Sequence, residues 1–290
     1  MNVEHIPVLL REVTEMLRPG QDGIYLDATI GPGGHAEGIL QCAGNCTLIG
    51  IDRDEKAIER AKERLKNYRN VHFIRDSFAN IKAAVNSLGY DSVNGILLDL
   101  GVSALHLKSE GRGFSFLKDE PLDMRMDQRQ GLTAEDVVNR YPGKELATVI
   151  WQYGEERFSR KIAKAIVNAR RRKRIRSCRE LAGIIEKVIR RGRIHPATRT
   201  FQAVRIEVNK ELEELPAAID AGVELLEPEG RFCVISYHSL EDRIVKNAFK
   251  KLAKDGLFNI ITKKPLVPDR QEQRLNPSSR SAKLRVGEKI

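Results

Sequence analysis

A glycine-rich turn close to the N-terminus constrains the fold more than any other part of this chain. The segment DATIGPGGH runs from Asp27 to His35, and the segment GIDRD follows it, with Asp52 at its centre. A strand that ends in such a turn, followed by a helix and a second strand that ends in an acid, is how open α/β sheets hold a nucleoside. Glycine lets the backbone adopt positive φ and approach a ligand closely, and the Asp52 carboxylate is placed to accept hydrogen bonds from ribose hydroxyls. The turn therefore predicts a site for a nucleoside cofactor.

Two nucleoside cofactors compete for this turn. The spacing of Gly31, Gly33 and Ala36 satisfies the dinucleotide pattern of NAD-binding enzymes, in which backbone amides approach a pyrophosphate. Pro32 has no N–H group to donate to a phosphate, and this favours S-adenosylmethionine, which carries no phosphate. A glycine turn can also join a strand to a helix for structural reasons alone, so the turn by itself leaves these readings open.

The composition is that of a globular protein. Of 290 residues, 41% are hydrophobic and 31% are charged, which allows a buried core in one large or two ordinary domains. The four cysteines have no paired spacing, which argues against a zinc site and against a disulfide framework. The N-terminus lacks the pattern of a signal peptide, and no apolar run approaches the length of a membrane span. We expect a cytoplasmic protein with no metal and no membrane association.

Positive charge is concentrated in one segment. Residues 157–206 contain 17 Lys or Arg and two acids, a net charge of +15, whereas the whole chain carries +10. Within this segment the run RRRKRIR, Arg170 to Arg176, has no acid to neutralise it. Charge runs often form solvated helix faces, but an uncompensated run of this kind favours a polyanion such as nucleic acid as the partner.

The order of strand and helix patterns predicts an α/β fold with a doubly wound, mostly parallel sheet. Strand patterns at VHFIRD and GILLDLG follow the glycine turn, and GILLDLG is a continuous apolar run typical of interior parallel strands. Between Lys108 and Thr200 helix patterns occur without a convincing strand, and strand patterns return at RFCVISYHS. We therefore expect a discontinuous sheet domain of residues 1–107 and 201–290, and an inserted all-helical, basic domain of residues 108–200.

Further expectations concern the insertion and the chain beyond it. One long helix is expected over residues 201–226, and a long polar loop over residues 265–280. In the insertion, Asp123, Arg125 and Asp127 alternate with methionines and form either an ion-paired hinge or a structural turn.

Polar residues stand at or just past the ends of several expected strands. They are Asp27, Asp52, Asp76, Asp99 and His238. The carboxyl ends of parallel strands share one edge of a sheet, so these residues should surround one crevice. Asp99 and His238 are the catalytic candidates: Asp99 can accept a hydrogen bond from an amino group or be a structural carboxylate, and His238 fits a substrate contact or a helix cap. No nucleophile elbow accompanies His238, and the pattern leaves the proton acceptor open.

RNA contacts are expected from the basic segment. Arginines beside hydroxyl and amide side chains, as in IHPATRTFQAVRI, are typical of phosphate contacts. The candidates are Arg170, Arg171, Arg172, Lys173, Arg174, Arg199 and Arg205.

The chain resembles the RsmH (MraW) family over essentially its whole length. The blocks that carry the resemblance, in chain order, are HIPVLL, GPGGH, GIDRD, GILLDLGVS, RGFSF, PLDMRMD, YGEERFSRKIA, HPATRTFQAVRI, ISYHSLEDRIVK and RSAKLR. The resemblance implies a class I S-adenosylmethionine methyltransferase with a Rossmann-like sheet and an inserted helical substrate domain. It also implies methylation of N4 of a cytidine in the decoding centre, the P-site region, of 16S rRNA.

The resemblance assigns cofactor contacts residue by residue. Gly33, Gly34 and His35 would contact S-adenosylmethionine, Asp52 its ribose and Phe78 its adenine, with Asp99 nearby and His106 where the family has a glutamine. NPSSRS near the C-terminus stands where the family has NPRARS, so one arginine of a possible phosphate contact is missing.

On this reading, catalysis consists of holding a weakly nucleophilic exocyclic amine in line with the methyl group, in a pocket without water. Asp99 or a backbone carbonyl would accept a hydrogen bond from that amine. The cytidine must leave its stack to be reached. An assembled or nearly assembled small subunit is the expected substrate. The sequence leaves open the oligomeric state of the protein, including whether it forms a homodimer. An NAD-dependent oxidoreductase and a non-catalytic RNA-binding assembly factor are the alternatives.

Overall fold

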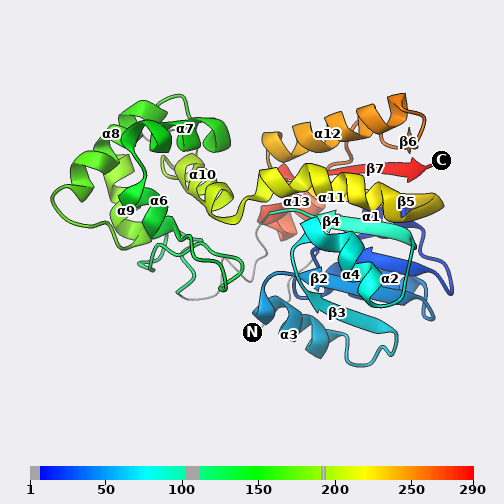
Figure 1. The fold of residues 1–290 in the computed structure, drawn as a ribbon. Coiled ribbons are helices and arrows are strands. Elements are labelled where there is room, and N and C mark those ends of the chain that lie inside the picture. The colour runs from blue at the N-terminus through cyan, green and yellow to red at the C-terminus, as the bar shows by residue number, and fades with distance from the viewer. Residues whose placement is uncertain (1–6, 102–110, 191, 193) are drawn as a thin grey trace. The chain divides into compact units, whose positions relative to one another are not determined.

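The computed structural model describes residues 7–101, 111–190, 192 and 194–290. The chain folds into two compact units, which Figure 1 shows. The sheet unit comprises Met1–Gly101 and Leu212–Ile290, and the helical unit comprises Val102–Glu211. The sequence placed the insertion at residues 108–200, whereas the described residues of the helical unit continue to Glu211.

The sheet unit is built on a seven-stranded sheet with the order β3-β2-β1-β4-β5-β7-β6. Its strands are β1 (Ile24–Asp27), β2 (Thr47–Asp52), β3 (Val71–Arg75), β4 (Val93–Asp99), β5 (Leu226–Ser236), β6 (Phe258–Ile260) and β7 (Lys283–Lys289). The strands from β1 to β5 pair in parallel, whereas β7 runs antiparallel to both β5 and β6. The expected α/β fold with a doubly wound, mostly parallel sheet is confirmed.

Helices cover both faces of this sheet (Figure 1). They are α1 (Leu10–Leu17), α2 (Gly34–Cys42), α3 (Glu55–Arg64), α4 (Ile81–Ser87), α11 (Glu211–Leu225) and α12 (Ser239–Lys254). The unit also contains the short helix α13 (Arg270–Leu275), which has no buried residue. One apolar core joins α4, α11 and α12 to the sheet, and a second core joins α1, α2 and α3 to it. Strand β4 contributes Ile96 and Leu98 to the first core and Leu97 to the second, as expected for an apolar strand buried on both sides.

The expectation of one long helix over residues 201–226 is wrong. The structure has α10 (Thr198–Asn209) followed by α11, and β5 begins directly after α11. The break lies at Lys210, whose left-handed φ of 53° ends α10. Across the break the Arg205 guanidinium donates two hydrogen bonds to the Glu211 carboxylate, at 3.0 Å each.

The expectation of a polar loop over residues 265–280 is wrong in part, because the segment contains α13 and a short 3₁₀ helix, η2 (Pro277–Ser281). Asp269 caps α13 by accepting a hydrogen bond from the Glu272 backbone N–H at 2.7 Å. The Glu272 side chain in turn accepts a hydrogen bond from the Leu9 backbone N–H at 2.8 Å. These contacts tie the C-terminal segment to the start of the chain.

The helical unit has an apolar core of its own. The helices α6 (Ala134–Arg140), α7 (Gly143–Gly154), α8 (Ser159–Arg170), α9 (Cys178–Glu186) and α10 all contribute to it. Phe201, Val204 and Val208 of α10 belong to this core, which is why the compact unit continues beyond residue 200. Across the part of the chain that the structure describes, no helix is both long enough and apolar enough to cross a membrane.

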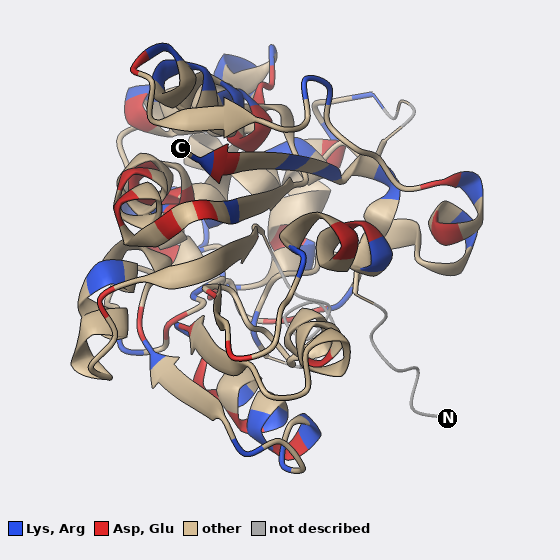
Figure 2. Ribbon diagram, turned by 90° about the vertical axis from the view of Figure 1, so that its right-hand side faces the viewer, with Lys and Arg blue, Asp and Glu red and all other residues tan. Residues whose placement is uncertain are grey.

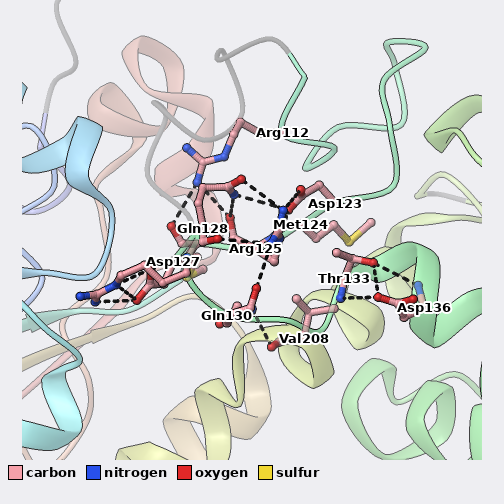
Figure 3. Close-up of polar contacts among 12 residues, drawn as sticks. Arg112, Asp123, Met124, Arg125, Asp127, Gln128, Gln130, Thr133, Asp136 and Val208 are labelled. Carbon is pink, nitrogen blue, oxygen red and sulfur yellow. Dashed lines mark hydrogen bonds and ion pairs between the residues drawn. The ribbon is translucent and has the colours of Figure 1, made fainter.

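The segment PLDMRMD forms an ion-paired turn inside the helical unit (Figure 3). Arg125 donates two hydrogen bonds to the Asp123 carboxylate, at 2.9 and 2.7 Å, and a third to the Gln130 carbonyl at 2.8 Å. The Gln130 side chain donates to the Val208 carbonyl of α10 at 3.0 Å. The Asn209 side-chain amide accepts a hydrogen bond from the Met126 backbone N–H and donates one to the Met124 carbonyl, both at 2.8 Å. These contacts anchor the segment to α10, as expected of a structural turn.

Candidate active site

The parallel sheet brings four acids to one edge. Asp27, Asp52 and Asp99 are the last residues of β1, β2 and β4, and Asp76 follows β3 directly. Strand β1 lies between β2 and β4, so the first three acids end neighbouring strands. The sheet thus gathers the strand-end acids that the sequence singled out.

The glycine turn after β1 uses its own amide groups internally. Gly31 and Gly33 have positive φ values of 51° and 83°. The Gly31 N–H donates to the Asp52 carboxylate at 3.0 Å, and the Gly33 N–H donates to the Ile30 carbonyl at 2.8 Å. Pro32, between them, has no N–H. Across residues 31–33, all of which the structure describes, no backbone N–H remains for a pyrophosphate.

Burial changes the charge state of two of the acids. It raises the pKa of Asp27 to about 8; a backbone hydrogen bond from Thr29 opposes this rise, and the nearby charges of Asp99 and Asp52 add to it. Burial likewise raises the pKa of Asp99 to about 7, against a hydrogen bond from Tyr237 that lowers it. Acids crowded away from water favour a cationic ligand. S-adenosylmethionine carries a sulfonium and an ammonium group, which would favour the charged form of these acids, whereas a pyrophosphate would disfavour it, so the residues present fit S-adenosylmethionine.

Asp99 is held by two groups that sequence reasoning missed. The Tyr237 hydroxyl donates a hydrogen bond to Asp99 Oδ1 at 2.8 Å, and the Asp99 backbone N–H donates to Thr29 Oγ1 at 2.6 Å. Burial and the neighbouring Asp99 raise the pKa of Tyr237 well above its usual value, so the hydroxyl keeps its proton. The available sequence signal was the position of Tyr237, directly after the strand that neighbours β4.

His35 and Gly34 pack against the start of the chain. The His35 side chain is only 7% exposed, and its Nε2 lies 2.9 Å from the Val8 carbonyl oxygen. Burial lowers the pKa of His35 to about 4, so the ring is neutral at pH 7 and Nε2 carries the proton that it donates to this carbonyl. Nδ1 is then an acceptor and faces Asp99 Oδ2 at 3.8 Å. A Cβ atom on Gly34 would lie 2.5 Å from the ring of Pro7, so packing also requires this glycine.

Phe78 lies beside the ends of β2 and β3, at the start of the 3₁₀ helix η1 (Phe78–Asn80). The Arg53 guanidinium lies over its ring, 5.3 Å from the ring centroid. Arg53 also donates to the Ser77 hydroxyl at 2.9 Å and pairs with Glu214 of α11, which accepts a hydrogen bond from Ser77 at 2.6 Å. This network fixes the ring next to the strand that carries Asp52.

His238 caps a helix. It is the N-cap residue of α12, and its Nδ1 accepts a hydrogen bond from the Glu241 backbone N–H at 3.4 Å. Nε2 lies 3.1 Å from the buried carboxylate of Glu241, and that carboxylate accepts a hydrogen bond from the Tyr237 backbone N–H at 2.8 Å. Of the two readings given to His238, this geometry favours the cap.

His106 lies outside the described residues. Among the residues that the structure does describe, no group of three or more His, Cys, Asp or Glu is arranged to hold a metal ion.

Five of the seven side chains expected to contact RNA are paired inside the helical unit. The pairs are Arg170 with the carbonyls of Val138 and Tyr141 (2.7 Å each), Lys173 with Glu180 (2.7 Å), Arg174 with Glu135, Arg199 with Glu156 (3.8 Å) and Arg205 with Glu211 (3.0 Å). Among the described residues, Arg171 and Arg172 have no such partner, and both are exposed. Arg170 and Arg205 are half-buried and join separate elements, so each has a structural role that their charge in the sequence did not reveal.

Comparison with known proteins gives one family. The model of the MraW methylase family matches residues 2–290. A protein of Persephonella marina is 51% identical over 293 residues, which cover 99% of this chain and 100% of that protein. Relatives from Caldicellulosiruptor saccharolyticus and Clostridium botulinum are each 48% identical, over 305 residues (99% of both chains) and 311 residues (100% of both chains). All three are named Ribosomal RNA small subunit methyltransferase H. The NAD reading is therefore wrong, and the chain belongs to the MraW methylase family, as an S-adenosylmethionine-dependent methyltransferase of the class I fold.

Proposed function

We propose that this protein transfers the methyl group of S-adenosylmethionine to N4 of a cytidine in the decoding centre, the P-site region, of 16S rRNA. Its full-length relatives are named as small-subunit rRNA methyltransferases, and the sequence blocks resemble the RsmH (MraW) family. The observation that carries the proposal is the Asp99 carboxylate, held by Tyr237 at the end of β4 within a group of acids that suits a cationic methyl donor. The cytoplasm, where small subunits assemble, is the proposed location.

The proposed cofactor site lies along the ends of β1, β2 and β4. Its residues are Gly33, Gly34, His35, Asp52, Phe78 and Asp99, with His106 as a further candidate. The N-terminus of α2, which begins at Gly34, carries a partial positive charge that suits a carboxylate of the ligand. Asp52 would accept hydrogen bonds from ribose hydroxyls, and the ring of Phe78 would pack against the adenine.

The protein's part in the chemistry is to orient the amine and to receive a proton. The bound cofactor supplies a methyl group activated by its positively charged sulfur. The Asp99 carboxylate can accept a hydrogen bond from the cytosine amine, which directs the nitrogen lone pair and offsets the positive charge that develops on it. A pKa of about 7 suits Asp99 to take the proton that this nitrogen loses when its new bond to carbon forms. Tyr237 holds the carboxylate in place throughout.

The proposed RNA substrate must present its cytidine outside the base stack, because an amine inside a helix is out of reach. A decoding-centre target implies an assembled or nearly assembled small subunit as the substrate. The charge of the helical unit supports the binding of surrounding phosphates.

Methyl transfer from labelled S-adenosylmethionine to unmodified small subunits tests this proposal. We expect nuclease digestion and chromatography to recover the label as N4-methylcytidine from the decoding region, and naked 16S rRNA to accept less label than the subunit. Asp99→Ala should abolish the transfer, whereas a non-catalytic assembly factor would show no transfer in either form. Label on another base, or no transfer at low salt by the unaltered protein, would overturn the proposal.

A further inference from the structure

Helix α8 has one apolar face and one cationic face. Its buried residues are Ser159, Ile162, Ala163 and Ile166. Its exposed polar residues are Arg160, Lys161, Lys164 and Asn168. At 3.6 residues per turn the two sets lie on opposite sides of the helix. The exposed residues Arg157 and Arg171 extend the second set beyond both ends of α8. We call Arg157, Arg160, Lys161, Lys164 and Arg171 the α8 cation face.

The α8 cation face lies in a stretch of sequence without acids. The sequence contains no acid from residue 157 to residue 179. Within the described part of the chain, none of the five cations has an ion pair or a hydrogen bond to a carboxylate. The neighbouring side chains Arg170, Lys173 and Arg174, by contrast, are paired within the unit. Cations that repel one another along a helix without compensation favour an anionic partner.

Two exposed aromatic rings lie on the segment that leads into α8. Trp151, in the last turns of α7, is 61% exposed, and Phe158, directly before α8, is 43% exposed. The Arg157 guanidinium lies over the Phe158 ring, 4.9 Å from its centroid. Large aromatic side chains left in water are typical of interaction sites. Aromatic rings beside cations are the combination with which proteins bind single-stranded nucleic acid, since bases stack on the rings and cations contact the backbone.

We propose that the α7–α8 turn and the α8 cation face bind a single-stranded segment of ribosomal RNA. Unpaired bases stack on Trp151 and Phe158, and the cations of the face contact the phosphates that follow. This inference rests on the proposed function and specifies where the RNA substrate is held. It assigns the contact mainly to residues before the arginine-rich run, in which Arg170, Lys173 and Arg174 are paired within the helical unit.

RNA fits this surface better than a protein partner does. An acidic protein would match the cations, but it would not require two aromatic rings beside them. Unpaired bases offer π-faces for those rings, and their phosphates supply negative charge at regular intervals along one strand. Duplex RNA would leave the rings unused, because its bases are already stacked.

Intrinsic fluorescence reports on this surface directly, because Trp151 is the single tryptophan of the chain. Titration of the full-length protein with a short single-stranded RNA of small-subunit sequence should quench the Trp151 emission, and the matching duplex should quench it less. Polyglutamate serves as the acidic-protein probe, and it should leave the emission unchanged. Quenching by polyglutamate but not by RNA would overturn the proposal in favour of a protein partner.

Substitutions separate stacking from charge. Trp151→Leu and Phe158→Leu should each weaken binding of a dye-labelled single-stranded RNA by about 5- to 100-fold, the usual effect of losing one stacked base. Arg160→Gln with Lys164→Gln should reduce the slope of log Kd against log salt by about 1.4, at about 0.7 for each phosphate contact in a single strand. The matched control is Lys56→Gln with Arg60→Gln on α3, the same residue types at the same spacing, on an exposed face that also carries Glu59 and Glu63. The control should leave the slope unchanged.

The inference and the proposed function can fail separately. S-adenosylmethionine affinity and thermal unfolding, measured for every variant, show whether the fold is intact. If the unaltered protein methylates small subunits while the aromatic variants bind RNA as it does, the inference is wrong and the function stands. If RNA quenches Trp151 but the unaltered protein transfers no methyl group, the function is wrong. Equal losses of slope in both double variants would show a general charge effect and overturn the assignment to α8.

Discussion

At the scale of single residues, the contact between Tyr237 and Asp99 is expected to set the pH dependence of the reaction. Tyr237→Phe removes the hydroxyl that stabilises the ionised carboxylate, so the pKa of Asp99 should rise above its present value of about 7. Activity that needs ionised Asp99 is present above this pKa and is lost as the pH falls through it. In the variant the loss should therefore begin at higher pH, which a profile of kcat/KM between about pH 6 and pH 9 would show.

Asp99→Asn is the companion variant, because its amide cannot ionise. We expect a fall in kcat of about 100-fold or more and the disappearance of the acidic limb. If Tyr237→Phe lowered activity equally at every pH, the hydroxyl would act through packing alone.

The second residue-scale prediction concerns the ribose contact. Asp52→Asn should weaken S-adenosylmethionine binding by about 10- to 100-fold, because hydrogen bonds to a charged acceptor contribute about 1.5–3 kcal/mol. The variant can also loosen the turn, since the Asp52 carboxylate accepts the N–H groups of Gly31 and Asp54 at 3.0 and 2.8 Å. Calorimetric titration measures the affinity, and Asp91→Asn, on an exposed loop before β4, is the control. Unchanged affinity in Asp52→Asn would remove Asp52 from the proposed site.

Sequence reasoning found the acids of the site but not their partners. The grouping of Asp27, Asp52 and Asp99 follows from a topological rule, because parallel strands end at a common edge. The hydrogen bond from Tyr237 to Asp99 depends on how two side chains of neighbouring strands point, which no local pattern encodes. The same holds for His35, whose ring contacts the Val8 carbonyl 27 residues earlier in the chain.

At the scale of elements, the start of α9 makes a testable contribution to the stability of the helical unit. The Ser177 hydroxyl accepts a hydrogen bond from the Glu180 backbone N–H at 3.2 Å, and the Glu180 side chain bonds back to the Ser177 N–H at 3.4 Å. Ser177→Ala should lower the free energy of unfolding by about 1 kcal/mol. Ser177→Asn, which keeps a capping oxygen, should cost much less, and urea denaturation followed by circular dichroism compares the two. Equal losses in both variants would show that the hydroxyl acts through something other than the cap.

Element existence was easier to predict than element boundaries. The strands at GILLDLG and VHFIRD and the helices α7, α8 and α9 follow from the spacing of their apolar residues. The break between α10 and α11 has no Gly or Pro at it to mark it. It lies at Lys210, where the left-handed backbone is accompanied by the Arg205–Glu211 pair and by Asn209 contacts to the 121–130 segment. A tertiary arrangement, not local propensity, ends that helix.

At the scale of the whole molecule, charge divides between the two units. The helical unit carries 25 Lys or Arg and 14 acids, a net +11, whereas the sheet unit is close to neutral at −1. Figure 2 shows basic and acidic residues interspersed on the helices and strands of the protein. Long-range attraction of a polyanion should therefore come from the helical unit.

This division predicts that salt affects the two ligands differently. Methyl transfer to small subunits at limiting concentration should fall by about 10³-fold or more between 50 and 200 mM salt if about six or more phosphates are contacted. The affinity for S-adenosylmethionine should change far less, because that site is small and partly buried. Parallel measurements of transfer and of cofactor binding across the salt series check this, and equal salt sensitivity of both would contradict it.

The sequence alone determined the sheet type, the presence of a helical insertion, the family resemblance and the acids at the strand ends. Each of these depends on local periodicity, on composition or on the shared edge of parallel strands. The tertiary structure decided which polar and charged side chains are paired within the protein, and with which partners. It pairs Asp99 with Tyr237, makes His238 a helix cap, and leaves the α8 cation face exposed while pairing Arg170, Lys173 and Arg174 of the arginine-rich run. The physical reason is that hydrogen bonds and burial depend on the directions of side chains from distant segments, and only the folded chain fixes those directions.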